Sequence, residues 1–394
     1  MSIAAVPRYL GQDFRSASPG MRFGMYLAIW HRDWSKAKDP DWRSICKMNK
    51  GDQGDQALLK SLLGRQSALF ASLPEQDSLY LPAKATAPFT TGLGNEHPLE
   101  NGFAFLWPYG LPYLPGSGVK GVVRQAAREL ASGEWGETHG WSSNRRHTVK
   151  SGKTTLELSD LDLLFGLESA DGGKEHFRGL LTFWDVIPEI SGDLAVDVMT
   201  PHQKHYYQEG QPPHDSGQPI PITFLTVPPG STFHFHVTCD TSRMRRIAPK
   251  LLEPVDGTPP WQALLAAAFG HAFDWLGFGA KTAVGYGVMA RDETAEQQRK
   301  ARVEQVAFEQ LSPEQRLIEG LRKVFEEEMK KGTLGAGSQT SQKRLELLQA
   351  ALEWEDAGLR RQAAALIRET LKRLPWSKKQ KKQGIEEKLQ RLEQ

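Results

Sequence analysis

The chain has 394 residues, 39% of them hydrophobic, which is enough for a sizeable core and two or three domains. Its 49 lysines and arginines nearly balance its 47 acidic residues, leaving a formal net charge of +2. This balance excludes a strongly basic coat, so any nucleic-acid contact must be local. Cys46 and Cys239 lie far apart, which argues against a disulfide framework and a zinc site. No apolar run reaches the ~18 residues of a membrane span. We therefore expect a cytoplasmic protein without a membrane partner.

Residues 1–85 are predicted to form a separate N-terminal piece. Leucines at helical spacing predict a helix over residues 56–73. Trp30, Trp34 and Trp42 lie close together before it, which is typical of a packed corner. A base-stacking platform is the alternative, because lysines flank the three tryptophans.

Residues 86–94 have the composition of a strand, and residues 95–103 form a loop rich in turn formers. His97 lies in this loop without a partner at catalytic or ligand spacing. A lone loop histidine is more often a hydrogen-bonded structural residue than a general base. Both interpretations of His97 remain open at this point.

A turn at Pro115-Gly116 leads into a predicted helix with Ser117 as its candidate N-cap. Small apolar residues recur on one face of this helix, and Lys120, Arg124 and Arg128 follow at four-residue spacing on another. A helix start with free N–H groups beside a basic stripe indicates an anion-binding edge. The alternative is an ordinary solvated face.

Residues 131–160 are polar and predict an inserted loop, whereas strands dominate residues 178–239. Residues 220–227 and 231–239, joined by a Pro-Pro-Gly turn, predict a β-hairpin. His202 follows an earlier predicted strand, residues 194–199. The His202/His205 and His234/His236 pairs lack a carboxylate at a recognised ligand spacing, so we predict no metal and no other cofactor.

A predicted helix over residues 261–275 ends in a glycine-rich loop. We name the segment 277–287 the glycine loop; its candidate site residues are Gly277, Gly279, Lys281, Thr282, Gly285, Tyr286 and Gly287. Glycines let a backbone approach a ligand closely, so the loop is suited to phosphate, with a lysine adding charge. It has no Walker ending and follows a helix rather than a strand, which excludes two better-known phosphate loops. A tight structural turn is the alternative.

Beyond residue 290 the pattern becomes helical. Ser312-Pro313-Glu314-Gln315 is a helix start with a capping-box pattern and proline at the first position. Two further amphipathic runs follow, over residues 342–354 and 359–374. Residues 377–382 are strongly basic, typical of a solvated tail or, second, of nucleic-acid contact. The chain therefore divides into three predicted parts, 1–85, 86–290 and 291–394.

In order and spacing, several of these motifs resemble the RAMP superfamily of CRISPR-associated RNA-binding proteins, and within it the type III-B Cmr complex. The resemblance covers about residues 85 to 290. It is carried by Gly92-Leu93-Gly94 with His97-Pro98-Leu99-Glu100-Asn101-Gly102, by Leu111-Pro112-Tyr113-Leu114-Pro115-Gly116-Ser117 with Val119-Lys120-Gly121, by Pro201-His202 with Tyr206-Tyr207, and by residues 279–287 of the glycine loop. It implies an α+β fold with a ferredoxin-like (RRM-like) β-α-β-β-α-β core, and the glycine loop between the last helix and strand.

The resemblance also implies a function. Its partners would be CRISPR guide RNA, target RNA and other Cmr-complex subunits, held by a non-catalytic backbone subunit that contacts phosphates through the basic stripe and the glycine loop. His97 and His202 join these as RNA-binding candidates. The rival hypothesis is a metal-independent endoribonuclease that processes repeat RNA with His97 or His202 and Lys281. A third is a protein-interaction scaffold that docks through its helical tail.

Overall fold

The computed structural model describes residues 2–37, 40–52, 54–151, 154–168, 176–200, 210, 212, 221–335, 337–376 and 384–393. The chain is a mixed α and β protein with several small sheets. It divides into two compact units, Met1–Glu296 and Gln297–Gln394. Helix α9 (Glu293–Gln310) spans the division.

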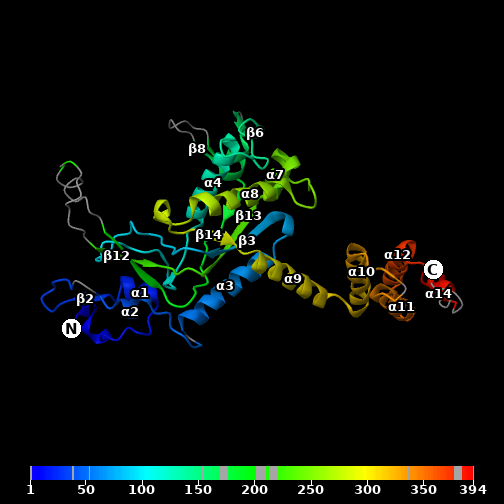
Figure 1. Ribbon diagram of the computed structural model, residues 1–394, viewed down its shortest axis with the longest axis horizontal. Helices are drawn as coiled ribbons and strands as arrows, with labels where there is room; N and C mark the ends of the chain where they lie inside the picture. The colour runs from blue at the N-terminus through cyan, green and yellow to red at the C-terminus, as the bar shows by residue number, and fades with distance from the viewer. Residues whose placement is uncertain are drawn as a thin grey trace. The chain divides into compact units, whose positions relative to one another are not determined.

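A four-stranded antiparallel sheet forms the centre of the first unit (Figure 1). Its strands lie in the spatial order β10 (Leu181–Phe183), β13 (Thr232–Cys239), β3 (Ser78–Ala85) and β14 (Met289–Arg291). Helix α4 (Gly116–Ser132) lies between β3 and β10 in the chain, and helix α8 (Pro260–His271) lies between β13 and β14. The sheet and these two helices therefore follow one another as β-α-β-β-α-β, with other elements inserted.

Helices α4 and α8 cover one face of the sheet (Figure 1). Phe233, Phe235 and Val237 of β13 are buried on this face, and the Phe235 ring lies 5.3 Å from that of Phe269 in α8. Helix α4 buries the apolar face that its spacing predicted, with Val119, Val123, Ala126, Ala127 and Leu130. Burying each large side chain contributes about 1.5–3 kcal/mol, so this layer stabilises the unit substantially.

Helix α3 (Asp55–Ala71) lies on the opposite face of the sheet (Figure 1). Its Phe70 is buried, with ring centroids 4.6 Å from His236 and 5.5 Å from Trp184. His234 lies on the same face of the strand as His236. Its Nδ1 and the Tyr80 hydroxyl are joined by a hydrogen bond of 2.7 Å. The N-terminal piece thus packs against the sheet instead of standing apart from it, and strand β3, residues 78–85, is central in that sheet.

Smaller elements surround this centre. Strands β1 (Ile3–Ala4) and β2 (Ala28–Trp30) pair near the N-terminus, where helices α1 (Pro19–Gly24) and α2 (Trp42–Cys46) also lie. The inserted elements are β4 (Phe105–Leu106), β5 (Leu111–Pro112), β6 (His147–Ser151), β7 (Thr154–Leu158), α5 (Asp160–Phe165), β8 (Leu167–Glu168), β9 (His176–Phe177), β11 (Ala195–Met199), β12 (Ile222–Thr226) and α7 (Thr241–Ile247). The segment expected to be an inserted loop, residues 131–160, contains the β6–β7 hairpin.

The predicted hairpin over residues 220–239 is wrong. Strand β12 pairs with β11, with Phe224 opposite Asp197, whereas β13 pairs with β3 and β10. The Pro-Pro-Gly turn therefore connects two different sheets. Both strands carry apolar residues suited to burial, and their partners lie elsewhere in the chain.

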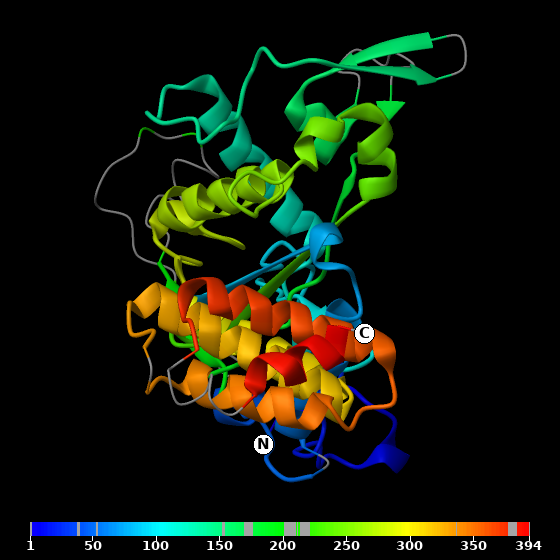
Figure 2. The same cartoon turned by 90° about the vertical axis from the view of Figure 1, so that its right-hand side faces the viewer.

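The second unit is a bundle of helices α10 (Pro313–Lys331), α11 (Gln339–Ala351), α12 (Ala357–Arg373) and α14 (Ile385–Glu393) (Figure 2). Their buried faces form one core around Leu321, Leu347, Ile367 and Leu389. The predicted capping box is confirmed, because the Ser312 hydroxyl accepts from the Gln315 N–H and the Gln315 side chain accepts from the Ser312 N–H. The basic run at residues 377–382 lies outside the described residues. Of the helices in the described ranges, none is long and apolar enough to cross a membrane.

Candidate nucleic-acid interface

Helix α4 begins directly beside the end of strand β10. Pro115 precedes the helix and Gly116 is its first residue. A Cβ atom on Gly116 would lie 2.2 Å from the Phe183 carbonyl oxygen, so the close packing requires glycine. The Gly116 N–H donates to Asp185 Oδ1 at 2.7 Å and holds the first turn against the sheet. Ser117, expected as the N-cap, therefore lies inside the first turn.

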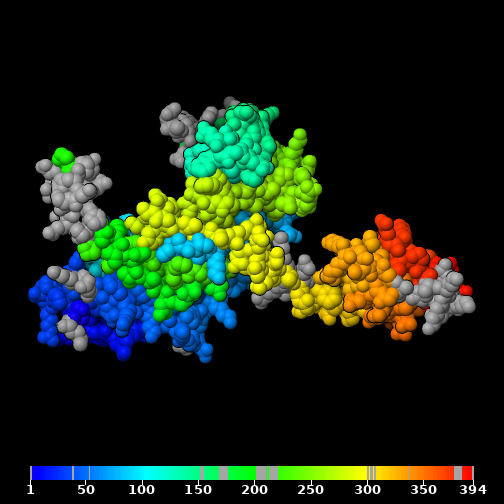
Figure 3. Space-filling model, viewed as in Figure 1, coloured from blue at the N-terminus to red at the C-terminus, as the bar shows by residue number. Residues whose placement is uncertain are grey.

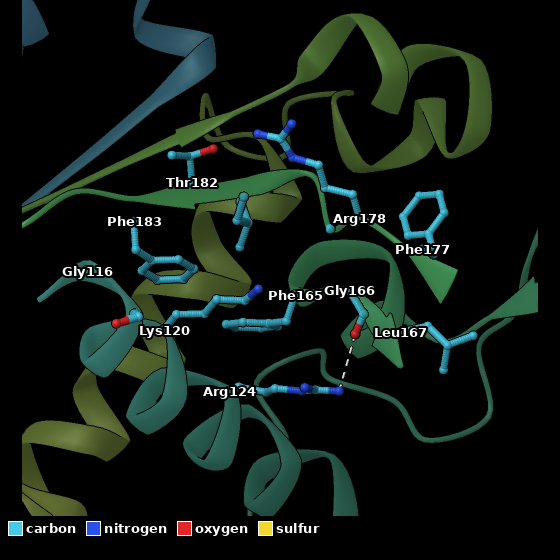
Figure 4. Close-up of a pocket in the computed structure, with 13 residues that line it drawn as sticks. Gly116, Lys120, Arg124, Phe165, Gly166, Leu167, Phe177, Arg178, Thr182 and Phe183 are labelled. Atoms are coloured by element: carbon cyan, nitrogen blue, oxygen red, sulfur yellow. Dashed lines mark hydrogen bonds between the residues drawn. The ribbon is translucent and has the colours of Figure 1, made fainter. Parts of the chain in front are cut away.

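A pocket of about 390 Å³ opens at these first turns, and we name it the α4 pocket (Figure 4). Its walls come from α4, β10 and the segments 165–167 and 177–179. Three cationic side chains line it: Lys120 and Arg124 from α4, and Arg178 from the segment before β10. Figure 4 shows Lys120 between the other two.

Within the described part of the chain, no carboxylate forms an ion pair with any of these three cations. Arg124 donates from Nη2 to the Gly166 carbonyl oxygen at 3.2 Å, while its buried Nε has no partner. Burial, and then the charge of Arg124, hold the pKa of the Lys120 ammonium below its ordinary value. A bound anion would compensate this positive charge, so the α4 pocket is suited to phosphate.

The basic stripe predicted on α4 divides into two parts. Ser117, Lys120 and Arg124 line the α4 pocket, whereas Arg128 does not. Arg128 is exposed and donates from Nη1 to Gln125 Oε1 at 3.3 Å on its own helix. Of the three cations in the stripe, only the two nearest the start of the helix, Lys120 and Arg124, line the pocket.

The glycine loop packs tightly on the segment that follows β3. The N–H of Ala280 donates to Thr90 O and that of Gly287 to Pro88 O, both at 2.8 Å. A Cβ on Gly279 would lie 2.3 Å from Thr90 O, and one on Gly287 would lie 1.8 Å from Phe278 O. These two glycines therefore serve the close approach of backbone to backbone. Gly285, by contrast, has open space where its Cβ would lie.

The side chains of the loop turn toward the β11–β12 ladder. Lys281 Nζ lies 5.4 Å from the centroid of the Phe224 ring, and the Tyr286 hydroxyl donates to Asp197 Oδ2 at 2.5 Å. In Figure 3 the yellow surface around residue 280 adjoins the green surface of these strands. Gly277 lies at the start of the loop, where an added Cβ atom would be 3.3 Å from the Thr282 side chain and from the Tyr286 carbonyl oxygen. Lys281 is half-buried on an aromatic ring, and Thr282 lies beside it at the tip.

A sequence model described as the RAMP superfamily matches residues 83–290, which is more than half of the 394 residues. The chain belongs to the RAMP superfamily. The chain is 29% identical over 238 residues to a protein of Pyrococcus furiosus named CRISPR system Cmr subunit Cmr6, covering 52% of this chain and 65% of that protein. The chain therefore spans less than two thirds of this relative's length.

Two solved structures are similar to the chain. One is described as the cryo-EM structure of the type III-B Cmr-beta bound to cognate target RNA, with 18% identity, a TM-score of 0.40, and 64% and 69% of the two chains covered. The other is the crystal structure of Cmr6 from Pyrococcus furiosus, with 26% identity, a TM-score of 0.29, and 56% of this chain and 100% of that chain covered.

Both ring nitrogens of His97, in the RAMP domain, form hydrogen bonds. Nδ1 accepts from the Leu99 N–H at 3.1 Å, so Nε2 carries the proton and donates to Phe23 O at 2.9 Å. The ring stacks on that of Phe23 at 3.8 Å, and burial lowers its pKa. This geometry is that of a structural histidine. His202 lies outside the described residues.

Sequence reasoning missed Arg178 and the three phenylalanines that also line the α4 pocket, Phe165, Phe177 and Phe183. Arg178 stands more than fifty residues after Lys120, and only a turn-forming Arg-Gly pair ahead of a strand marked its position. Among the described residues there is no group of three His, Cys, Asp or Glu side chains arranged to hold a metal ion. At the start of α4 the RAMP domain presents three cationic side chains, those of Lys120, Arg124 and Arg178.

Proposed function

We propose that the chain is a non-catalytic, RNA-binding backbone subunit of a type III-B (Cmr) effector complex in the cytoplasm, acting in antiviral defence. Its membership of the RAMP superfamily and its similarity to Cmr6 support this assignment. Its partners would be CRISPR guide RNA, target RNA and other Cmr subunits. The helical second unit offers a surface for subunit contacts beyond the RAMP domain.

The observation that carries the proposal is the α4 pocket with its three cations and no paired carboxylate among the described residues. The partial positive charge at the start of α4 adds to this field, and Asp185 offsets part of it where it accepts from Gly116. Contacts to phosphate carry no sequence information. A subunit that reads the backbone in this way would hold any guide, and base pairing would supply specificity.

The four-stranded sheet with α4 and α8 is, in this proposal, the ferredoxin-like core of the family. Its strand order and its β-α-β-β-α-β sequence support the assignment. An RRM-like core usually binds RNA by stacking bases on sheet aromatics. In this chain Phe70 of α3 packs over that face, which favours RNA contact at the helix edge instead.

The absence of catalysis belongs to the same proposal. His97, the described histidine that sequence reasoning offered as a base, has both ring nitrogens engaged and a lowered pKa. Incubation of the chain with repeat RNA, with and without divalent metal, is expected to leave the RNA intact. Site-specific cleavage that His97→Ala or His202→Ala abolishes would instead support the processing endoribonuclease.

The salt dependence of RNA affinity tests the α4 pocket. Each phosphate contact to single-stranded RNA contributes about 0.7 to the slope of log K against log salt, so Lys120→Gln with Arg124→Gln should reduce the slope by about 1.4. The double variant should lose RNA affinity to the same extent for RNAs of unrelated sequence. Arg128→Gln is the matched control, because Arg128 lies on the same helix outside the pocket. An unchanged slope in the double variant, with thermal stability preserved, would contradict the proposal.

A further inference from the structure

A second pocket, of about 330 Å³, lies between helix α1 and the β4–β5 hairpin. We name it the hairpin pocket. Its floor consists of buried aromatic rings, those of Phe23, Phe103 and Phe105. Trp107, in the turn of the hairpin, and Tyr113, directly after β5, also line it. A volume near the lower end of the range for small-molecule sites suits one compact ligand group.

Polar groups line this aromatic pocket without partners of their own. The Asn95 amide, the Trp107 indole N–H and the Tyr113 hydroxyl form no hydrogen bond with any residue that the structure describes. Trp107 is 53% exposed, so its ring is accessible to a ligand. His97 also lines the pocket, but with both nitrogens engaged it offers only its ring. The pocket therefore suits a flat aromatic ligand with hydrogen-bonding edges.

Its place along the chain connects it with the α4 pocket. Tyr113 lines the hairpin pocket and Gly116 lines the α4 pocket. Gly116 follows Tyr113 by three positions, so their Cα atoms are at most about 11 Å apart. The start of α4, where phosphates are proposed to bind, and the hairpin pocket are therefore lined by neighbouring parts of one short segment.

We propose that the hairpin pocket receives one unstacked base of the RNA whose phosphates bind in the α4 pocket. The inference rests on the proposed function and adds a base contact to it. Single-stranded RNA is recognised through bases that are turned out, stacked on aromatic side chains and hydrogen-bonded on their edges. Trp107 and Tyr113 supply the rings, and the Asn95 amide supplies both a donor and an acceptor. The cations of the α4 pocket favour a nucleotide over an aromatic side chain of a partner protein, and Glu96, which lines the hairpin pocket, requires the phosphates to lie on the α4 side of the base.

The first arm of the test uses bases without phosphate. Saturation-transfer NMR on the full chain with adenosine and uridine should show transfer to base protons, and Trp107→Ala should abolish it. Trp135→Ala is the matched control, because Trp135 is 49% exposed and does not line the hairpin pocket. Transfer to N-acetyltryptophanamide with none to either nucleoside would overturn the proposal in favour of a protein side chain. Tyr113→Leu repeats the test should Trp107→Ala unfold.

The second arm separates the base contact from the phosphate contact. Trp107→Ala should weaken binding of a seven-nucleotide RNA about tenfold, the effect of losing one base–aromatic stack, and leave binding of the matching abasic strand unchanged. Lys120→Gln should weaken both strands equally. An equal effect of Trp107→Ala on both strands, or no effect on either, would overturn the base pocket. No effect of Lys120→Gln with the Trp107 pattern intact would refute the phosphate site alone.

Discussion

Two glycines of the glycine loop make a matched pair that separates packing from ligand contact. Gly285 and Gly287 both have positive φ, +91° and +70°, so alanine is strained at either position. They differ in surroundings, because a Cβ on Gly285 meets open space and one on Gly287 meets the Phe278 carbonyl oxygen at 1.8 Å. Substituting each by alanine therefore imposes similar strain and a different steric cost.

The expected losses follow from the contacts. Left-handed strain costs about 1–2 kcal/mol in each variant. Gly287→Ala must also shift two hydrogen bonds, from Gly287 N–H to Pro88 O at 2.8 Å and from Phe278 N–H to Gly287 O at 2.9 Å. Each is worth about 0.5–1.5 kcal/mol, which brings the loss for Gly287→Ala to about 2–5 kcal/mol. Gly285→Ala should lose only the strain.

Urea unfolding followed by tryptophan fluorescence measures this difference. Nine of the 11 tryptophans precede residue 297, so the signal reports mainly on the first unit. Equal destabilisation by the two variants would refute the packing argument. RNA affinity supplies a second measurement: a stable Gly285→Ala protein with weakened RNA binding would show that the loop tip touches RNA, as the phosphate hypothesis for the loop requires.

Three further outcomes are expected. Burial, and then the hydrogen bond to Asp197, raise the pKa of Tyr286 to about 12. The free energy of unfolding should therefore fall as pH rises from 10 toward 12. Urea midpoints should show this decline in the wild type and not in Tyr286→Phe. Because the pKa of His97 is lowered in the folded chain, this side chain binds a proton more readily when the chain is unfolded. The free energy of unfolding should therefore fall as pH drops below 6.5. Urea midpoints should fall less in His97→Gln than in the wild type. Arg344 is fully buried in the helical unit, with two unpartnered nitrogens and a pKa lowered to about 10 by burial; calorimetry should show Arg344→Met no less stable than the wild type.

Local patterns predicted the elements of this fold better than their pairing. The apolar face of α4 and the capping box of α10 depend on neighbours three and four residues away, and both are confirmed. Strand pairing depends on distant segments. Strand β13 pairs with β3, so that His234 lies opposite Pro82, and no periodicity near residue 234 records that partner. The expected hairpin of β12 with β13 failed for this reason.

In the candidate site, too, residues close in the sequence were predicted and contacts between distant segments were not. Lys120 and Arg124 were found because one helix spaces them four residues apart on one face. Arg178 reaches the same pocket from a separate segment, and only the sheet brings it there. The glycine loop was predicted as a segment, but the role of Gly279 and Gly287 in backbone packing depends on residues 88–90, almost two hundred positions earlier.

The arrangement gives a physical reason for the proposed RNA contact at the edge of this sheet. A bare sheet face with aromatic residues would stack bases, but Phe70 of α3 packs over Trp184 and His236, so base stacking there would require displacing a buried ring. Removing such a ring from its packing costs about 3–5 kcal/mol, more than the about 1–3 kcal/mol that one stacked base returns. The cations of the α4 pocket require no such displacement, because their charge is already uncompensated by the described residues. Energetics therefore favour phosphate contact at the start of α4 over base contact on the sheet.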